Sequence, residues 1–235
     1  MLKEGRRVVP PVDSGSEILV GSKIDCIETG FNPNFSLAEF VEKRVADESR
    51  FLGRGGVGKV FELGHGLCIK IMENRHTKPD AHKYNLGNSP LDEFRIQNRL
   101  RGFEASGCFA PNTVACYAGA ETSAIMMEQI DGAELQKILN GEEVLPDSFD
   151  FDTFFEALDD YLQEMHDRFG IVHNDLEPRN LMVDRTTGLP RLIDFGRSLE
   201  VGALDTQKAE RIKNAELDKM DVVYQTVERF LNKIN

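Results

Sequence analysis

Two short segments of the chain carry side chains that suit phosphoryl transfer. The first, residues 171–180, contains Asp175 and, five residues later, Asn180. A carboxylate can accept the proton of an acceptor hydroxyl, and a neighbouring carboxamide can bind a metal ion. The second segment, residues 193–196, contains Asp194, which adds another hard oxygen ligand. Because Mg²⁺ prefers such donors and keeps several waters, a few protein ligands and a nucleotide suffice to hold it.

Each segment also has an ordinary structural explanation when it is taken alone, because Asp and Asn often stabilise turns. Asp175 and Asp194, however, lie 19 residues apart on either side of a predicted hairpin. A glycine-rich segment and a lysine in an apolar strand precede them. The combination favours chemistry on ATP with a divalent metal ion, Mg²⁺ or Mn²⁺.

The glycine-rich segment, residues 53–60, reads Gly-Arg-Gly-Gly-Val-Gly-Lys-Val. A dinucleotide-binding turn of this pattern opens a helix, whereas a loop that covers nucleotide phosphates returns into a second strand. Residues 59–63 alternate as a strand does, which favours the second alternative. A plain hairpin explains the segment equally well when nothing else is considered.

Lys70 interrupts the apolar stretch 67–71, where a lysine must either reach solvent or meet an anion. An exposed edge strand is the commoner reason for such a lysine. Lys70 nevertheless follows Gly58 by 12 residues, so its strand can return beneath the glycine-rich segment and point the ammonium group at phosphates. Glu93, on the helix that follows, is the expected partner, because the neighbouring Asp92 is expected to cap that helix.

The elements that must position these groups begin with a sheet. Its strands are predicted at residues 51–52, 60–63, 67–71 and twice within 112–130, the last at 124–128. Residues 74–88 are expected to form a loop. Two helices are predicted in this half: 36–48, capped by Ser36, and 90–101, capped by Ser89, with Pro90 in its first position and Gly102 behind it.

The back half is predicted to be mostly helical, with helices at 133–140, 152–169 and about 206–233. The apolar face of the second is formed by Phe155, Leu158, Leu162 and Met165, with Tyr161 at its edge. The stripe of the third is formed by Met220, Val223, Val227, Phe230, Leu231 and Ile234. A hairpin joins 181–183 to 191–193 through Thr187-Gly188. The chain is thus expected to divide into a partly ordered lead-in, 1–35, and two parts, 36–130 and 131–235.

Composition excludes several classes of protein. The net charge of −12 argues against sequence-independent binding of nucleic acid, which needs a surplus of Lys and Arg. No run approaches the ~20 apolar residues of a membrane span, and no signal peptide is recognisable at the N-terminus. The cysteines, at 26, 68, 108 and 116, lack metal-ligand spacing and are expected to be buried or free thiols in a reducing compartment.

In order and spacing, these segments resemble the protein-kinase superfamily over about residues 50 to 230. The resemblance implies an α+β fold of two lobes, an N-lobe with an antiparallel sheet (36–130) and a truncated helical C-lobe (131–235). It implies Asp175 as the catalytic base, Lys70 paired with Glu93, and Asn180 and Asp194 as metal ligands. It implies a nucleotide site formed by Gly53, Gly55, Gly56, Gly58, Val60 and Lys70, by the gatekeeper Met127, and by backbone groups of Glu128 and Ile130.

The departures from the family pattern concern regulation and charge. Asn174 stands where the family usually has arginine, no Ala-Pro-Glu motif follows Gly196, and 39 residues remain after it. Glu177 stands where a phosphate-contacting lysine is usual, and Arg179, Lys59 and Arg197 are the candidates to compensate for its charge. The resemblance implies that residues 173–180 form the catalytic loop and that Asp221 braces this loop. The form resembles minimal kinases of the Bud32 and RIO groups and the shortened kinases that some bacteria deliver into host cells.

The leading hypothesis is therefore an atypical Ser/Thr kinase that acts on a protein, with itself among the candidate substrates. It would act in the cytoplasm or, after secretion as an effector, inside a host cell, with an activating protein partner as a further expectation. A small-molecule kinase and a pseudokinase that binds nucleotide as a scaffold are the alternatives. Glu177 and the missing activation segment motivate the pseudokinase hypothesis.

Overall fold

Two sheets and a group of helices position the residues considered above. The structure, a computed structural model, describes residues 18–19, 48–54, 58–73, 87–118 and 122–234. The predicted helix 36–48 and the predicted loop 74–88 lie outside the described residues except for their last positions, and of the lead-in only Ile18–Leu19 is described. Among the described residues, no helix combines the length and apolar character that crossing a membrane requires.

The first sheet has six strands in the order β1-β7-β8-β4-β3-β2. Their bounds are Ile18–Leu19 (β1), Phe51–Arg54 (β2), Gly58–Gly64 (β3), Leu67–Glu73 (β4), Thr113–Ala118 (β7) and Thr122–Glu128 (β8). All neighbours pair antiparallel except β1, which pairs parallel with β7. The strands predicted from alternation are thus confirmed, and β3 and β4 extend further than predicted.

The helix α2, Pro90–Arg99, begins where the sequence predicts it. The Ser89 hydroxyl accepts the backbone N–H of Asp92 at 3.2 Å, and proline occupies the first turn, where its missing N–H has no partner to lose. Phe94 packs against Met72, Cys116 and Ile125 of the sheet. This contact places the buried face of α2, which includes Glu93, toward the strand that carries Lys70.

The second sheet belongs to the helical part of the molecule. Its order is β5-β6-β12-β11-β9, with bounds Glu104–Ala105 (β5), Cys108–Phe109 (β6), Pro190–Leu192 (β12), Leu181–Asp184 (β11) and Gly132–Glu134 (β9). A two-stranded sheet pairs β10, Ile171–Val172, with β13, Leu199–Glu200. β5 and β6 were not predicted, because two-residue strands leave no alternation to detect. The segment predicted as a helix at 133–140 begins as β9.

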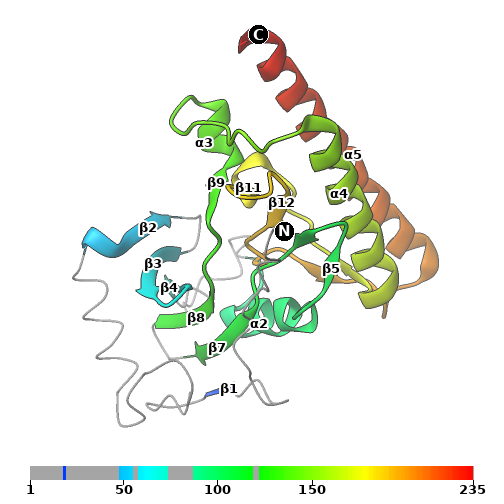
Figure 1. Cartoon of the computed structure of the whole chain (residues 1–235). Coiled ribbons are helices and arrows are strands. Elements are labelled where there is room, and N and C mark those ends of the chain that lie inside the picture. The colour runs from blue at the N-terminus through cyan, green and yellow to red at the C-terminus, as the bar shows by residue number, and fades with distance from the viewer. Residues whose placement is uncertain (1–17, 20–47, 55–57, 74–86, 119–121, 235) are drawn as a thin grey trace, which may run out of the picture.

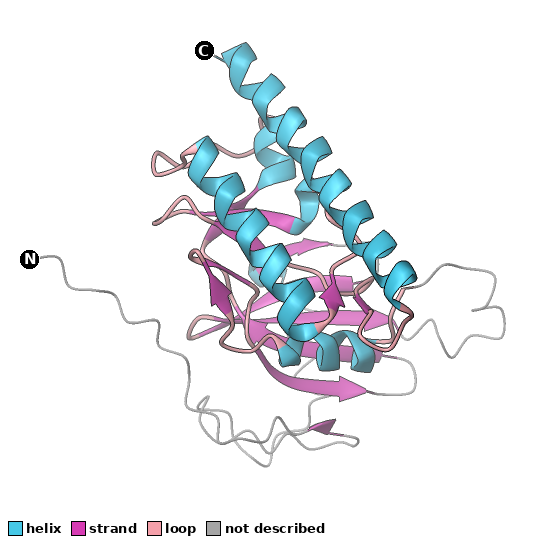
Figure 2. Cartoon of the chain, turned by 90° about the vertical axis from the view of Figure 1, so that its right-hand side faces the viewer, coloured by secondary structure: helices cyan, strands magenta, loops and turns pink. Residues whose placement is uncertain are grey.

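Three helices complete the fold: α3 (Leu135–Leu139), α4 (Phe151–Glu164) and α5 (Thr206–Ile234). α4 continues as a π-helical turn, Met165–Phe169. Figure 1 shows the first sheet beside this helical part, and Figure 2 shows the two long helices α4 and α5 in front of the strands. The α+β class is confirmed.

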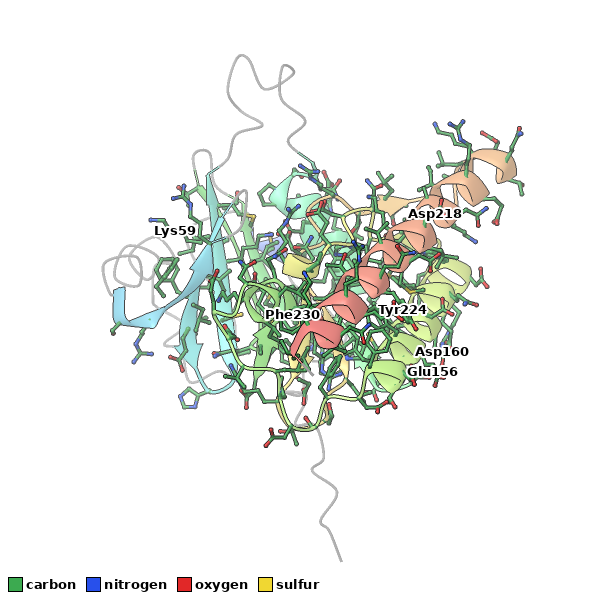
Figure 3. All side chains as sticks on the ribbon, turned by 90° about the horizontal axis from the view of Figure 1, so that it is seen from above. Lys59, Glu156, Asp160, Asp218, Tyr224 and Phe230 are labelled. Carbon is green, nitrogen blue, oxygen red and sulfur yellow. The ribbon has the colours of Figure 1, made fainter. Side chains whose placement is uncertain are left out.

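Aromatic contacts join α4 to α5. The Tyr224 ring lies 4.6 Å from the ring of Phe151 and 5.0 Å from that of Phe155, measured between centroids (Figure 3 labels Tyr224). Two details of the predicted apolar faces were wrong. Tyr161 is fully buried and stacks on Phe103 rather than lying at an edge, because β5 brings a neighbour that the helix pattern does not reveal. Ile234 is exposed, since α5 extends past its partner helix there.

The hairpin β11–β12 is the element that brings Asn180 and Asp194 together. Leu181 pairs with Leu192, so the residue before the first strand and the residue shortly after the second lie at the same end. The predicted turn at Thr187-Gly188 is confirmed. Gly188 has φ +73° and a Cβ there would come 2.1 Å from the Ser148 carbonyl oxygen, so no other residue fits.

Replacing Gly188 by alanine should therefore destabilise the fold more than the same change at Gly141. Gly141 has φ +74°, but a Cβ at that position would meet no atom within 4 Å. Gly141→Ala should therefore lower the free energy of unfolding by roughly 1–2 kcal/mol, the left-handed strain alone. Gly188→Ala adds overpacking and should lower it by roughly 2–5 kcal/mol. Chemical denaturation measures both, and equal losses would contradict the packing of this turn.

Candidate active site

Asp175 and Asn180 form one rigid unit. The 3₁₀ turn Pro178–Asn180 folds the chain back, so that Asn180 Nδ2 donates to the main-chain oxygen of Asp175 at 2.7 Å and to its Oδ2 at 3.0 Å. Both side chains are buried. The carboxylate is thus held in one orientation, as a proton acceptor at a reaction centre needs to be.

The backbone beside Asp175 is held by Glu216, from α5. Its Oε1 accepts the N–H of Asn174 at 2.5 Å and its Oε2 the N–H of His173 at 3.2 Å, while His166 Nε2 lies 2.7 Å from the same Oε2. Glu216 is 1% exposed. Two aligned N–H groups and an imidazole satisfy this buried carboxylate, which would otherwise be costly.

This finding corrects the expectation that Asp221 braces the catalytic loop. Asp221 is exposed, and α5 meets the loop more than one turn earlier, at Glu216. A signal for Glu216 existed in the sequence. It lies four residues before Met220 and seven before Val223, and therefore on the apolar face of α5, where an acidic residue needs a buried partner.

Lys70 joins three parts of the chain. Its Nζ lies 2.7 Å from Glu93 Oε1 on α2 and 2.7 Å from Asp194 Oδ1 behind β12. Burial alone lowers the pKa of Lys70, but the two carboxylates outweigh it and raise that pKa above its usual value. Burial alone would raise the pKa of Asp194, but the charge and hydrogen bond of Lys70 outweigh burial, and the pKa of Asp194 is lowered. Both groups are therefore charged at neutral pH, and the predicted pairing of Lys70 with Glu93 is present.

The segment around Asp194 is shaped to fit this ion pair. Asp194 itself has φ +65°, a strained conformation that its surroundings must enforce. Phe195 is fully buried against the His173 ring, 4.9 Å between centroids, and His173 Nε2 donates to the Ile193 carbonyl oxygen at 3.0 Å. A Cβ on Gly196 would come within 3.3 Å of the carboxylates of Asp194 and Glu93.

Asn180 and Asp194 have the donor set for a hard cation. The Ile193 N–H donates to the Asn180 carbonyl oxygen at 3.0 Å, which brings the two residues to the same place. Because Asn180 donates through its amide nitrogen, its side-chain oxygen stays available, and Lys70 occupies only Oδ1 of Asp194. These two oxygens suit Mg²⁺ or Mn²⁺ together with waters and nucleotide phosphates.

The face of the first sheet that carries Lys70 also carries other predicted nucleotide contacts. The register pairs Lys70 with Val60 and with Ile125, and Cys68 with Met127, so these side chains share one face. Met127 is partly buried against the cluster around Phe94, as a side chain at the back of a pocket would be.

The neighbouring predicted positions are placed in part. Gly53 lies on β2 and Gly58 on β3, where a Cβ on Gly58 would come 2.7 Å from the Ile71 carbonyl oxygen. Gly55 and Gly56 lie outside the described residues. The Glu128 carboxylate is fixed by Asn112 Nδ2 at 3.0 Å, and Ile130, two residues on, is partly buried.

Asparagine side chains hold the segment behind Gly196. Asn88 Nδ2 donates to the carbonyl oxygens of Ser198 at 2.9 Å and Phe195 at 3.3 Å, and its N–H donates to that of Gly196 at 2.6 Å. Asn174, which has the left-handed φ of +63° that asparagine tolerates, donates through Nδ2 to the Arg197 carbonyl oxygen at 3.1 Å. Sequence reasoning missed Asn88, because nothing local marks an asparagine in a loop as a long-range donor.

Comparison with known proteins agrees with this geometry. Residues 46–214 match the model of the protein kinase domain. The chain is 29% identical to serine/threonine-protein kinase PknB of Mycobacterium leprae over 174 residues, 70% of this chain and 26% of that protein. It is 30% identical to serine/threonine-protein kinase pkn3 of Myxococcus xanthus over 173 residues, 67% and 29%, respectively. It is 31% identical to mitogen-activated protein kinase kinase 2 of Arabidopsis thaliana over 159 residues, which are 65% of this chain and 42% of that protein.

The aligned part spans less than half the length of each of these relatives. The match to the kinase domain nevertheless covers more than half of this chain, and it includes Lys70, Glu93, Asp175, Asn180 and Asp194. The chain belongs to the protein kinase domain family.

Proposed function

We propose that the chain transfers the γ-phosphoryl group of ATP to serine or threonine hydroxyls of a protein, with Mg²⁺ or Mn²⁺. The observation that carries the proposal is the ion pair of Lys70 with both Glu93 and Asp194, 2.7 Å each. Asp194 is linked through the β11–β12 hairpin to Asn180 and hence to Asp175. The names of relatives, which include serine/threonine-protein kinases, support a protein as the acceptor.

The chain's own residues divide the work of the reaction. Asp175 accepts the proton of the acceptor hydroxyl, and Asn180 keeps its carboxylate in place. Lys70 offers its ammonium group to nucleotide phosphates, with Glu93 fixing its position. Asn180 and Asp194 would hold the metal ion, which when bound neutralises charge on the phosphates.

The arrangement is proposed to form without phosphorylation of the segment behind Gly196. Asn88 and Asn174 hold that segment through neutral amide groups and backbone oxygens, contacts that need no phosphate. In kinases that are switched by phosphorylation, a new ion pair with the phosphate orders this region instead. An activating partner protein is a separate hypothesis. Cys68, Cys108 and Cys116 are free, which supports action in a reducing cytoplasm, that of a host cell included.

Asp175→Asn should lower the rate of phosphoryl transfer by about 10²- to 10⁴-fold, because it removes the proton acceptor while keeping the hydrogen bond from Asn180. Asp194→Asn should abolish transfer through loss of the metal ligand and of the charge that faces Lys70. Transfer of labelled γ-phosphate to the chain itself and to a generic protein, followed by mapping of phosphosites, measures both. The control Asp221→Asn changes an exposed carboxylate and should be neutral. Undiminished phosphoryl transfer in both Asp175→Asn and Asp194→Asn would contradict the proposal that these residues carry out kinase chemistry.

Phosphatase treatment of the purified chain should leave its initial rate of phosphoryl transfer within about twofold of the untreated chain, since neutral amides hold the active arrangement. Asn88→Ala should lower the rate by about fivefold or more, because two side-chain hydrogen bonds of about 0.5–1.5 kcal/mol each are lost. Asn140→Ala is the matched control, because the hydrogen bonds of this exposed asparagine are confined to its own helix end. A rate that collapses on dephosphorylation would show that the amide contacts are insufficient.

A further inference from the structure

Glu177 places a negative charge where nucleotide phosphates must approach, yet it is not alone there. Arg179 Nη1 lies 2.5 Å from Glu177 Oε2, and Arg179 Nη2 lies 3.2 Å from Asp175 Oδ2 and 3.5 Å from its Oδ1. The guanidinium group of Arg179 therefore lies between the two carboxylates. The pair of Glu177 and Arg179 is electrically neutral as a unit, and its cation is the part that lies against Asp175.

The position of this guanidinium matters because of what happens beside Asp175. During transfer, the acceptor oxygen forms a bond to the γ-phosphorus while the bond from that phosphorus to the bridging oxygen of ADP breaks. ADP leaves with the electron pair, and the hydroxyl proton goes to Asp175. Negative charge spreads over the three equatorial oxygens of the moving phosphoryl group, which fixed cations stabilise. The γ-phosphoryl group must meet the acceptor oxygen beside Asp175, so a cation in contact with Asp175 is a candidate to reach these oxygens.

The other cations near the site are less well placed for this role. Lys70 is held by Glu93 and Asp194 for its contact with the nucleotide phosphates, and its ion pairs are with these two residues rather than with Asp175. Lys59 alternates with Val60 along β3 and therefore projects from the face of the sheet opposite to Lys70 (Figure 3 labels it). Arg197 Nη1 lies 3.6 Å from Asp175, beyond hydrogen-bonding distance.

Arg179 also has donors left for a phosphoryl group. A guanidinium carries five N–H donors in a planar fork, and the contacts to Glu177 and Asp175 use two of its nitrogens. Its side chain is 50% exposed, so an incoming nucleotide can reach it. Pro178, in the 3₁₀ turn between the two residues, fixes the backbone that presents both side chains to the same side.

We propose that Arg179 is a catalytic residue that donates hydrogen bonds to the transferring phosphoryl group, and that Glu177 is the positioning residue that holds it there. The inference rests on the proposed function and adds a role to it. Under this assignment Glu177 does not impair catalysis. It limits the conformations of a long, flexible side chain before the nucleotide binds.

Arg179→Gln should lower kcat by about 10²- to 10³-fold, the loss that follows removal of one donor to developing charge, while KM for the protein acceptor changes less than about threefold. Arg179→Lys should recover part of the loss, because it keeps the charge without the fork. Glu177→Gln should lower kcat less, by about tenfold. The exchanged double variant, Glu177→Arg with Arg179→Glu, should have a kcat at least about tenfold higher than that of Arg179→Gln, since it returns a cation to the same place.

A binding measurement separates catalysis from structural damage. ADP with aluminium fluoride and Mg²⁺ imitates the transferring group, so wild type should bind this combination more tightly than ADP with Mg²⁺ alone. Arg179→Gln should lose most of that difference while its affinity for ADP and its thermal stability stay unchanged. The matched control is Arg185→Gln, an arginine of equal exposure (49%) that also lies near two carboxylates, Asp131 and Glu143, and should behave as wild type.

The outcomes distinguish this inference from the function on which it rests. If wild type transfers phosphate and Arg179→Gln keeps kcat within about threefold, the role of Arg179 is wrong and the kinase assignment stands. If Glu177→Gln keeps kcat at the wild-type value, the positioning role of Glu177 is wrong. If the exchanged double variant is no better than Arg179→Gln, a cation at position 177 does not reach the transferring group, and the shared placement of the two side chains is wrong. If wild type transfers nothing to any acceptor, both assignments fall.

Discussion

The buried ammonium group of Lys70 determines how the active site assembles. Its partners, Glu93 and Asp194, come from a helix and from a turn more than a hundred residues further along the chain. Leaving any of these groups unpaired in the interior costs about 3–5 kcal/mol, a large part of a domain's total stability. α2 must therefore pack on the first sheet with Glu93 inward, and the segment around Gly196 must pass close enough to present Asp194. Gly196 has no Cβ, which would crowd both carboxylates.

A second buried charge, the carboxylate of Glu216, fixes the catalytic loop, just as Lys70 fixes the positions of Glu93 and Asp194. Glu216 binds two consecutive backbone N–H groups, and it reaches them from α5, which the Tyr224 ring fastens to α4. The β11–β12 hairpin then connects the two anchored regions, with Asn180 at one end and Asp194 at the other. Lys70 and Glu216 thus fix the backbone around the site, and the backbone in turn determines where the reacting side chains lie.

The parts of this arrangement that the sequence predicted are those with a local cause. Ser89 and Pro90 define the start of α2, alternation defines the strands around Lys70, and Thr187-Gly188 defines the hairpin. The pairing of Lys70 with Glu93 was predicted because a charge in an apolar strand requires a partner. The parts that were missed or misassigned depend on contacts between distant segments. Asp221 was chosen where Glu216 acts, because the level at which α5 passes the catalytic loop follows from packing. The place of Glu216 on the apolar face of α5 indicated that it needs a buried partner, but it did not say which partner. The same holds for Asn88, whose partners lie more than a hundred residues away. It also holds for β6, which pairs with the distant β12, and for β5, which pairs with β6.

The charge of the assembled site sets a condition on how it can bind nucleotide. Among the described residues, the side chains that form ion pairs around Lys70 and Asp175 are three cations, Lys70, Arg179 and Arg197, and four carboxylates, Glu93, Asp175, Glu177 and Asp194. Side chains alone therefore leave the site with net negative charge, and the triphosphate of ATP would add to it. The balance shifts only when a divalent cation shares Asn180 and Asp194 with the phosphates, so nucleotide and metal are expected to bind together. For catalysis, the position of each cation matters more than the net charge of the site. The guanidinium of Arg179 contacts Asp175 and can therefore act on the reacting atoms, while Glu177, on its far side, holds it in that position.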